Sequence, residues 1–155
     1  YAAGYFGYAY YAAESGNLRA VPISKSDPAS AVEPNQASVA AATYPLARPL
    51  FIYSDAQIMA EKPQVGAFIY FYLNNLADNI LDVGYFPAPE SEIAKAYGRL
   101  TSAVGIEVDS SGVTGDIITA GSSTVFPLSE RMAELFQQEG YTGNLTVDSI
   151  GTGAG

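Results

Sequence analysis

Three consecutive hydroxyl side chains lie between a predicted strand and a predicted helix. The segment reads Ile117-Ile118-Thr119-Ala120-Gly121-Ser122-Ser123-Thr124-Val125-Phe126-Pro127. The first N–H groups of a helix have no partner inside the helix and carry a partial positive charge, so they can hold a small anion without a cationic side chain. A plain N-cap by Ser122, Ser123 or Thr124 explains the same residues, and this motif alone does not favour either interpretation.

A second loop of this kind follows a strand with alternating side chains. Asn144-Leu145-Thr146-Val147-Asp148-Ser149 leads into Ile150-Gly151-Thr152-Gly153-Ala154-Gly155. Glycine lets a ligand approach the backbone closely, and successive N–H groups form a concavity suited to anions. A flexible terminus is the alternative interpretation. A dinucleotide fingerprint is a weaker one, because its helix and ribose-binding acid are absent from this sequence.

The two loops become more informative when they are considered together. Both follow strands, and parallel strands place such loops at one edge of a sheet, where ligands bind. A small oxyanion is the expected occupant.

Three helices are predicted from apolar period and proline placement. The first covers about 63–81, with Pro63 in its first turn, and the second follows Pro89, with Glu90 and Glu92 in its first turn. The third covers about 124–139 and stops near Gly140. Their apolar faces predict a core of Phe68, Tyr72, Leu100, Leu128, Met132 and Phe136, among others.

The first half of the chain is predicted to contain strands. The aromatic run from Tyr1 to Tyr11 predicts a short buried strand that meets a helical turn. Leu18–Ile23 and Leu46–Tyr53 are predicted as two more strands, the latter confined by Pro49 to an edge or a crossing. Residues 108–116 are polar and glycine-bearing, which predicts a linker or a surface hairpin.

Composition excludes several classes of function. The 155 residues include 16 acidic and 7 basic side chains, no His and no Cys, for a net charge of −9. No basic patch exists for nucleic acid or an anionic membrane, and no histidine relay, thiolate nucleophile or zinc-thiolate site can form. We therefore expect a binding module with no catalytic residues, no metal and no cofactor.

Several motifs resemble one family, the phosphate-binding solute receptors of phosphate ABC transporters. Gly121–Pro127 and Ser149–Gly155 resemble the start of the mature family sequence. Other segments look like its end, namely Gly4–Tyr10, Leu18–Ile23, Tyr44–Leu50 and Gly84–Pro87. The resemblance implies an α/β fold, a periplasmic-binding-protein-like (type II) lobe with a mostly parallel sheet flanked by helices.

The order of these segments is inverted relative to the family. The simplest explanation is a circular permutation, with residues 1–107 from the family's C-terminal part, a join at 108–116, and residues 117–155 from its N-terminal part, together forming one lobe-like unit. The family sequence continues beyond the glycine loop with an Asp that accepts the ligand's proton and with most of a second lobe. The chain is therefore expected to be one piece of a split or truncated receptor.

The resemblance also implies ligand-binding residues. Phosphate would be held by Ser123, Thr124 and Val125 at the helix start and by Gly151, Thr152 and Gly153 in the glycine loop. An alternative alignment matches Phe126-Pro127 in place of Thr124-Val125. Arg48, the basic residue inside the Tyr44–Leu50 motif, is interpreted as structural.

The expected function is reversible capture of inorganic phosphate outside the bacterial cytoplasm, in the periplasm or an equivalent compartment. The implied partners are a polypeptide or segment that supplies the other lobe and a membrane ABC permease, with no nucleic acid. Two alternatives remain open. The chain is a folding or assembly unit that binds no ligand, or it is a nucleotide-binding half-domain of an oxidoreductase, which is the weaker of the two.

Overall fold

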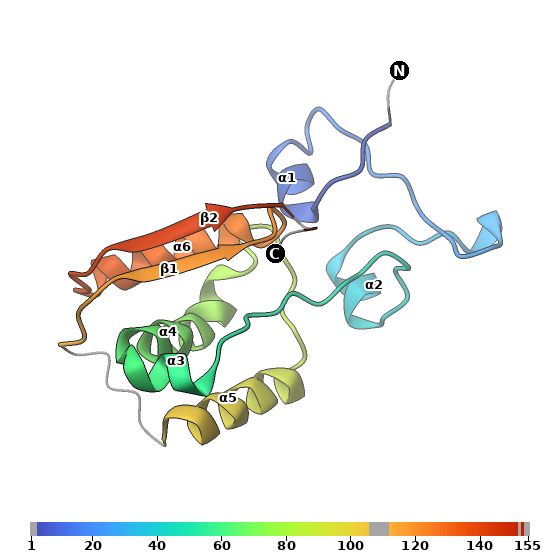
Figure 1. The fold of residues 1–155 in the computed structure, drawn as a ribbon. Coiled ribbons are helices and arrows are strands. Elements are labelled where there is room, and N and C mark those ends of the chain that lie inside the picture. Colours follow the sequence, from blue (N-terminus) through green and yellow to red (C-terminus); the bar gives the residue numbers. More distant parts are fainter. Residues whose placement is uncertain (1–2, 106–111, 152, 154–155) are drawn as a thin grey trace.

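The computed structural model describes residues 3–105, 112–151 and 153. The chain forms a body in which helices pack on one side of a small sheet, and an arm of residues 3–55 extends from this body to one side (Figure 1). The arm carries α1 (Tyr8–Ala13), a 3₁₀ turn η1 (Pro28–Ser30) and α2 (Gln36–Ala40). The body contains α3 (Ala56–Glu61), α4 (Pro63–Asn79), α5 (Glu90–Val104), β1 (Ile117–Gly121), α6 (Phe126–Gln138) and β2 (Leu145–Ser149).

The strands β1 and β2 form a two-stranded parallel sheet connected through α6. They pair in register from Ile117 opposite Leu145 to Gly121 opposite Ser149. Both predicted strands are therefore confirmed, as is their parallel direction. A mixed helix and strand structure with a parallel sheet fits the predicted α/β class.

The core lies between α4, α6 and the sheet. Phe68 and Tyr72 of α4 meet Met132 and Phe136 of α6, and Ile117 of β1 joins the same cluster. The Phe136 ring lies 5.4 Å from that of Phe68, between ring centroids. This ring contact joins residues that are 68 positions apart in the sequence.

The three predicted helices are present with small changes at their ends. The first ends at Asn79 instead of Leu81, and the second starts at Glu90 and ends at Val104. The third starts at Phe126, two residues later than predicted, because the backbone of Ser122–Val125 is occupied in a turn. Gly140 follows the last helix with a φ of 104°, a left-handed conformation that ends helices.

The strand predictions for the first half of the chain were wrong. Residues 3–7 contain no strand, and α1 occupies Tyr8–Ala13. Leu18–Ile23 contributes only one antiparallel bridge, between Ile23 and Val32, and Leu46–Tyr53 pairs with no other strand in the described chain. A strand needs a neighbour along its length for its backbone groups, and the described arm offers one only at the Ile23–Val32 bridge. Of the predicted linker, residues 112–116 form neither helix nor strand, and the remainder lies outside the described residues.

Gly84 allows α1 to pack against the body. It adopts a φ of 89°, and a Cβ at this position would lie 3.0 Å from the Cα of Ala9. Ala9 is buried, and the Tyr8 ring lies 4.8 Å from that of Phe86. The arm is therefore joined to the body by α1, which lies at the carboxyl end of the sheet (Figure 1).

Candidate functional site

The two polar loops leave the same edge of the sheet, as the sequence predicts. Gly121 and Ser149 are the last paired residues of the two strands. The N–H of Ile150 donates to the carbonyl of Gly121 at 3.0 Å, which extends the pairing into the second loop. The start of α6 and the glycine loop therefore begin side by side at the carboxyl edge of β1 and β2.

The first loop is a tight turn closed on Ser122. The N–H of Thr124 donates to the Ser122 Oγ at 3.2 Å, and the N–H of Val125 donates to the Ser122 carbonyl at 2.9 Å. The N–H of Phe126 reaches the same carbonyl at 3.2 Å. Ser122 thus acts as a local acceptor for the backbone donors that the sequence assigns to an anion. An anion at this position would compete with Ser122 for those donors.

The residues predicted for this loop lie close together in the structure. Ser123 is exposed, while Thr124 and Val125 are half-buried. Pro127 has no N–H, so the first turn of α6 offers one donor fewer than other helices do.

The second loop is described only in part. Gly151 has a φ of 87° and Gly153 lies in a turn, while the predicted hydroxyl donor Thr152 lies outside the described residues. Among the described atoms, none lies within 4 Å of a Cβ built at Gly151 or at Gly153. Glycine at 151 is therefore needed for its backbone conformation, since its left-handed φ strains any other residue.

Two tyrosines from outside this loop, both within residues 1–107, hold the carbonyls of the first loop. The Tyr10 hydroxyl donates to the Ser123 carbonyl at 2.9 Å, and the Tyr85 hydroxyl donates to the Thr124 carbonyl. A Cβ at Gly7 would lie 3.4 Å from the Thr124 methyl group, so the start of α1 lies against the same loop. The sequence analysis missed this contact. The only signal was the density of tyrosines, whose hydroxyls usually find a partner when buried.

Burial keeps the Tyr85 hydroxyl protonated. It raises the pKa of Tyr85 to about 12, with smaller contributions from Tyr10 and Tyr72. Burial raises the pKa of Tyr72 to about 12 as well, opposed by its hydrogen bond with Ser129. Tyr85 therefore remains a neutral donor to the loop even somewhat above pH 10, where an exposed tyrosine ionises.

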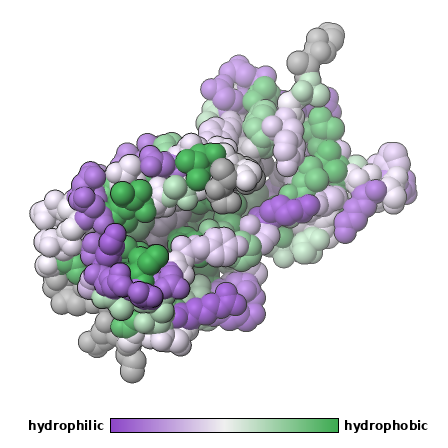
Figure 2. Space-filling view, in the orientation of Figure 1, coloured by the Kyte–Doolittle hydropathy of each residue, from purple (hydrophilic) through white to green (hydrophobic). Residues whose placement is uncertain are grey.

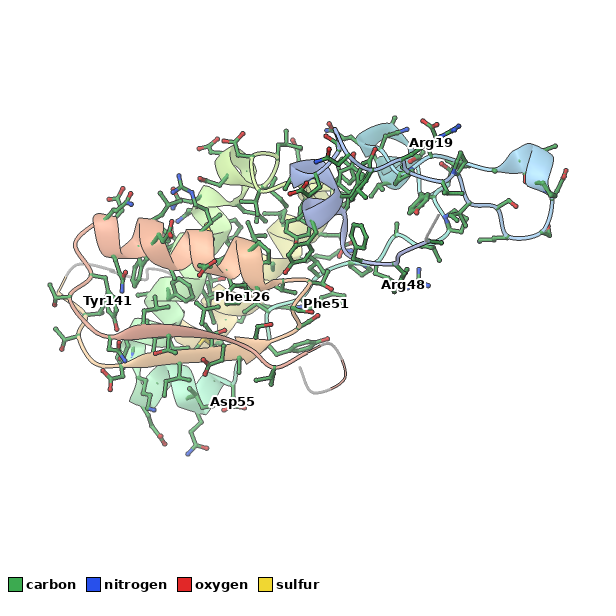
Figure 3. All side chains as sticks on the ribbon, turned by 90° about the horizontal axis from the view of Figure 1, so that it is seen from above. Arg19, Arg48, Phe51, Asp55, Phe126 and Tyr141 are labelled. Carbon is green, nitrogen blue, oxygen red and sulfur yellow. The ribbon has the colours of Figure 1, made fainter. Side chains whose placement is uncertain are left out.

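The described arginines of the arm lie away from the loop. Arg48 donates to the carbonyls of Pro45 and Ala47 at 3.2 and 2.7 Å, which supports the structural role expected for it. Figure 3 shows Arg19 and Arg48 on the arm, Phe126 at the carboxyl end of the sheet and Tyr141 at the opposite end. Neither arginine therefore adds a positive charge to the two polar loops.

Other features of the described residues do not add to this site. A cavity of about 310 Å³ lies at the amino ends of α4 and β1, lined by Pro63, Gln64, Gly112, Val113 and Thr114. Over residues 3–105, 112–151 and 153, no group of three acidic, His or Cys side chains could hold a metal ion. No helix in that part of the chain is long and apolar enough to cross a membrane.

Sequence comparison finds relatives that include a phosphate-binding protein. The chain is 41% identical over 99 residues to Protein SphX of Synechococcus elongatus, which covers 63% of this chain and 28% of that protein. It is 38% identical over 91 residues to Protein SphX of Synechocystis, which covers 58% of this chain and 26% of the relative. It is 34% identical over 87 residues to the phosphate-binding protein PstS of Staphylococcus aureus, and this match covers 56% of this chain and 26% of PstS. These similarities support a relationship to a phosphate-binding protein family.

The match to SphX of Synechococcus elongatus is too long to lie only in the C-terminal part of the chain. A matched stretch of 99 residues cannot fit within residues 108–155, so more than half of it lies in residues 1–107.

The chain spans about a quarter of the length of these curated relatives. No family model matches the chain, and no solved structure matches it.

Proposed function

We propose that the chain binds inorganic phosphate as part of the solute receptor of a phosphate ABC uptake system. The supporting observation is that two strand-to-glycine loops leave one edge of a parallel sheet in a chain that is 34% identical to a phosphate-binding protein over 87 residues. The proposed ligands are the six residues Ser123, Thr124, Val125, Gly151, Thr152 and Gly153.

Contact interactions allow an acidic chain to bind an anion. The net charge of −9 repels phosphate at long range, but that repulsion is screened within about 8–10 Å in physiological salt. Hydrogen bonds from backbone N–H groups and hydroxyls act at contact distance, where screening is weak. Binding would transfer the N–H donors of Thr124 and Val125 from Ser122 to the phosphate oxygens.

The remaining parts of the receptor are also proposed. Because the chain spans about a quarter of the relatives' length, a second polypeptide or a further segment would supply the other lobe. The sheet, helices and loops would form part of a periplasmic-binding-protein-like lobe. The inverted order of the family-like segments is proposed to be a circular permutation joined near 108–116. A membrane permease and an extracytoplasmic location complete this proposal.

Calorimetric titration of phosphate into the chain tests whether phosphate is its ligand. We expect Thr152→Val, which removes a proposed hydroxyl donor, to weaken phosphate binding by roughly 10-fold or more, since hydrogen bonds to charged groups contribute about 1.5–3 kcal/mol. Thr146→Val is the matched control, because Thr146 lies within β2 and is not a proposed ligand. This substitution should leave the affinity for phosphate unchanged. Sulfate is the comparison anion, and the complete receptor should bind it more weakly than phosphate. Absence of phosphate binding, in this chain and in any longer polypeptide that contains it, would contradict the proposal.

A second candidate function is assembly without ligand binding. It is favoured by the apolar side chains that the arm exposes, such as Tyr5 at 89% exposure, Phe51 and Tyr53. Figure 2 shows hydrophobic surface over both the arm and the body. Size-exclusion chromatography at several concentrations separates the candidates. Association without any effect of phosphate on stability supports assembly, whereas a monomer stabilised by phosphate contradicts it.

A further inference from the structure

The carbonyls of Ser123 and Thr124 are held by hydroxyls from two separate elements. Tyr10 lies on α1 and donates to the Ser123 carbonyl at 2.9 Å, while Tyr85 follows the turn after α4 and donates to the Thr124 carbonyl. These contacts span 113 and 39 residues of sequence. They connect residues 1–107 to the backbone of the loop at Ser122–Val125, which is proposed to bind the anion.

Peptide geometry links these carbonyls to the proposed donors. In a planar trans peptide, the C=O of one residue and the N–H of the next point in opposite directions. Fixing the Ser123 carbonyl therefore fixes the direction of the Thr124 N–H, and fixing the Thr124 carbonyl fixes that of the Val125 N–H. Both N–H groups point toward Ser122 in the structure.

The two tyrosines are themselves held in place. Tyr85 is 7% exposed, and its N–H donates to the Ile80 carbonyl at 2.9 Å. Tyr10 lies on α1, whose Ala9 packs against Gly84, the residue before Tyr85. The two hydroxyls thus belong to one packed unit that approaches the loop from the side opposite its N–H groups.

We propose that Tyr10 and Tyr85 are positioning residues, which orient the Thr124 and Val125 N–H groups for phosphate without touching it. This inference rests on the proposed function. The two hydroxyls fix the peptide planes while the N–H groups are still bonded to Ser122. Phosphate would then replace Ser122 as the acceptor without a change in the tyrosine contacts, so binding requires less reordering of the loop.

Tyr72 provides a matched control for the loss of a hydroxyl. It is 4% exposed in the same core, and its hydroxyl bonds to the Ser129 Oγ at 3.3 Å, further along α6. Tyr72→Phe removes a buried hydroxyl bonded to α6 but leaves the Ser123 and Thr124 carbonyls as they are. It should lower stability without changing phosphate affinity.

The experiment compares Tyr10→Phe, Tyr85→Phe and Tyr72→Phe in the full chain. NMR of the phosphate-free protein should show a changed carbonyl ¹³C shift at Ser123 in Tyr10→Phe and at Thr124 in Tyr85→Phe. The amide shift of the following residue, Thr124 or Val125 respectively, should change as well. Each of these two variants should weaken phosphate binding about five-fold, as expected for one hydrogen bond. Tyr72→Phe should leave both measurements at the parental values.

Three results would overturn the inference. Unchanged carbonyl shifts in Tyr10→Phe and Tyr85→Phe would show that the hydroxyls do not set the peptide planes. Equal loss of phosphate affinity in all three variants would show that stability alone is responsible. If the parental chain binds no phosphate, the proposed function fails and the role toward phosphate fails with it, while the NMR shifts still decide whether the tyrosines orient the loop. Should Tyr85→Phe fail to fold, Tyr10→Phe, at a more exposed residue, still decides the question.

Discussion

Gly121 and Ser149 lie opposite each other at the last position of the β1–β2 ladder. The chain therefore turns into its two polar loops at the same level of the sheet. Because α1 and Tyr85 contact the first of these loops, residues far apart in sequence meet at this edge.

Gly84→Ala should destabilise the protein. The left-handed φ of 89° disfavours a side chain by about 1–2 kcal/mol, and the added Cβ would lie 3.0 Å from the Ala9 Cα, so α1 would have to shift. We expect a loss of about 2 kcal/mol or more, measured by urea unfolding. Gly98→Ala is the control, because Gly98 lies within α5 with no described atom near its Cβ position. It should add roughly 0.5–1 kcal/mol of stability, so equal effects of the two substitutions would contradict the packing described for Gly84.

Stability should fall as the pH rises from about 10 to 12. Burial raises the pKa of Tyr72 and of Tyr85 from 10.0 to about 12, so between these values the folded state holds protons that the unfolded state has lost. The stabilisation is complete below pH 10 and disappears as the pH passes the folded-state value, with a loss on the order of 1.4 kcal/mol per pKa unit for Tyr72. Urea unfolding at several alkaline pH values measures this loss. Tyr72→Phe should reduce the pH dependence, and an unchanged profile in that variant would contradict the prediction.

Met132→Ala should cost about 2–5 kcal/mol, the usual range for a truncated core side chain. Met132 of α6 is 0% exposed and packs in the core with residues of α4 and β1, so the truncation leaves a cavity where α6 meets α4 and the sheet. Ile118→Thr, at a residue that is 73% exposed on the outer face of β1, should change stability by less than about 0.5 kcal/mol. Thermal and urea unfolding of both variants give the comparison. A comparable loss at Ile118 would mean that the outer face of the sheet is covered in solution.

Phosphate should stabilise the folded chain. A ligand that binds only the folded state adds about 2.7 kcal/mol when present at 100 times its dissociation constant. The melting temperature should therefore rise with phosphate concentration at constant ionic strength. Chloride at matched ionic strength is the control, and an equal rise with chloride would indicate a general salt effect.

Local signals in the sequence were sufficient for most of the body but insufficient for α3 and for the arm. α4, α5 and α6 follow from apolar spacing, because a helix satisfies its own backbone. The strands predicted in the arm failed because aromatic and β-branched residues mark a strand only where a neighbour pairs with it. α3 was missed, although Asp55 caps it by accepting the N–H of Gln57 at 2.7 Å.

The candidate site was predictable only in part, for a related reason. The adjacency of the two loops follows from parallel pairing, which the strand-loop-helix-strand order favours. The contacts of Tyr10 and Tyr85 depend on how α1 and the turn at Gly84 pack in three dimensions. Twelve tyrosines are present in the chain, and nothing local distinguishes these two from the others.

The in-register pairing of β1 and β2 also has a kinetic consequence. The whole ladder and its connecting helix lie within residues 117–149, so their contacts are close in sequence. Short-range contacts form with little loss of chain entropy, whereas the contact between Tyr10 and Ser123 closes a loop of 113 residues. The sheet and α6 should therefore become protected from hydrogen exchange early in refolding, and the amide of Thr124 should be protected only after the arm has docked.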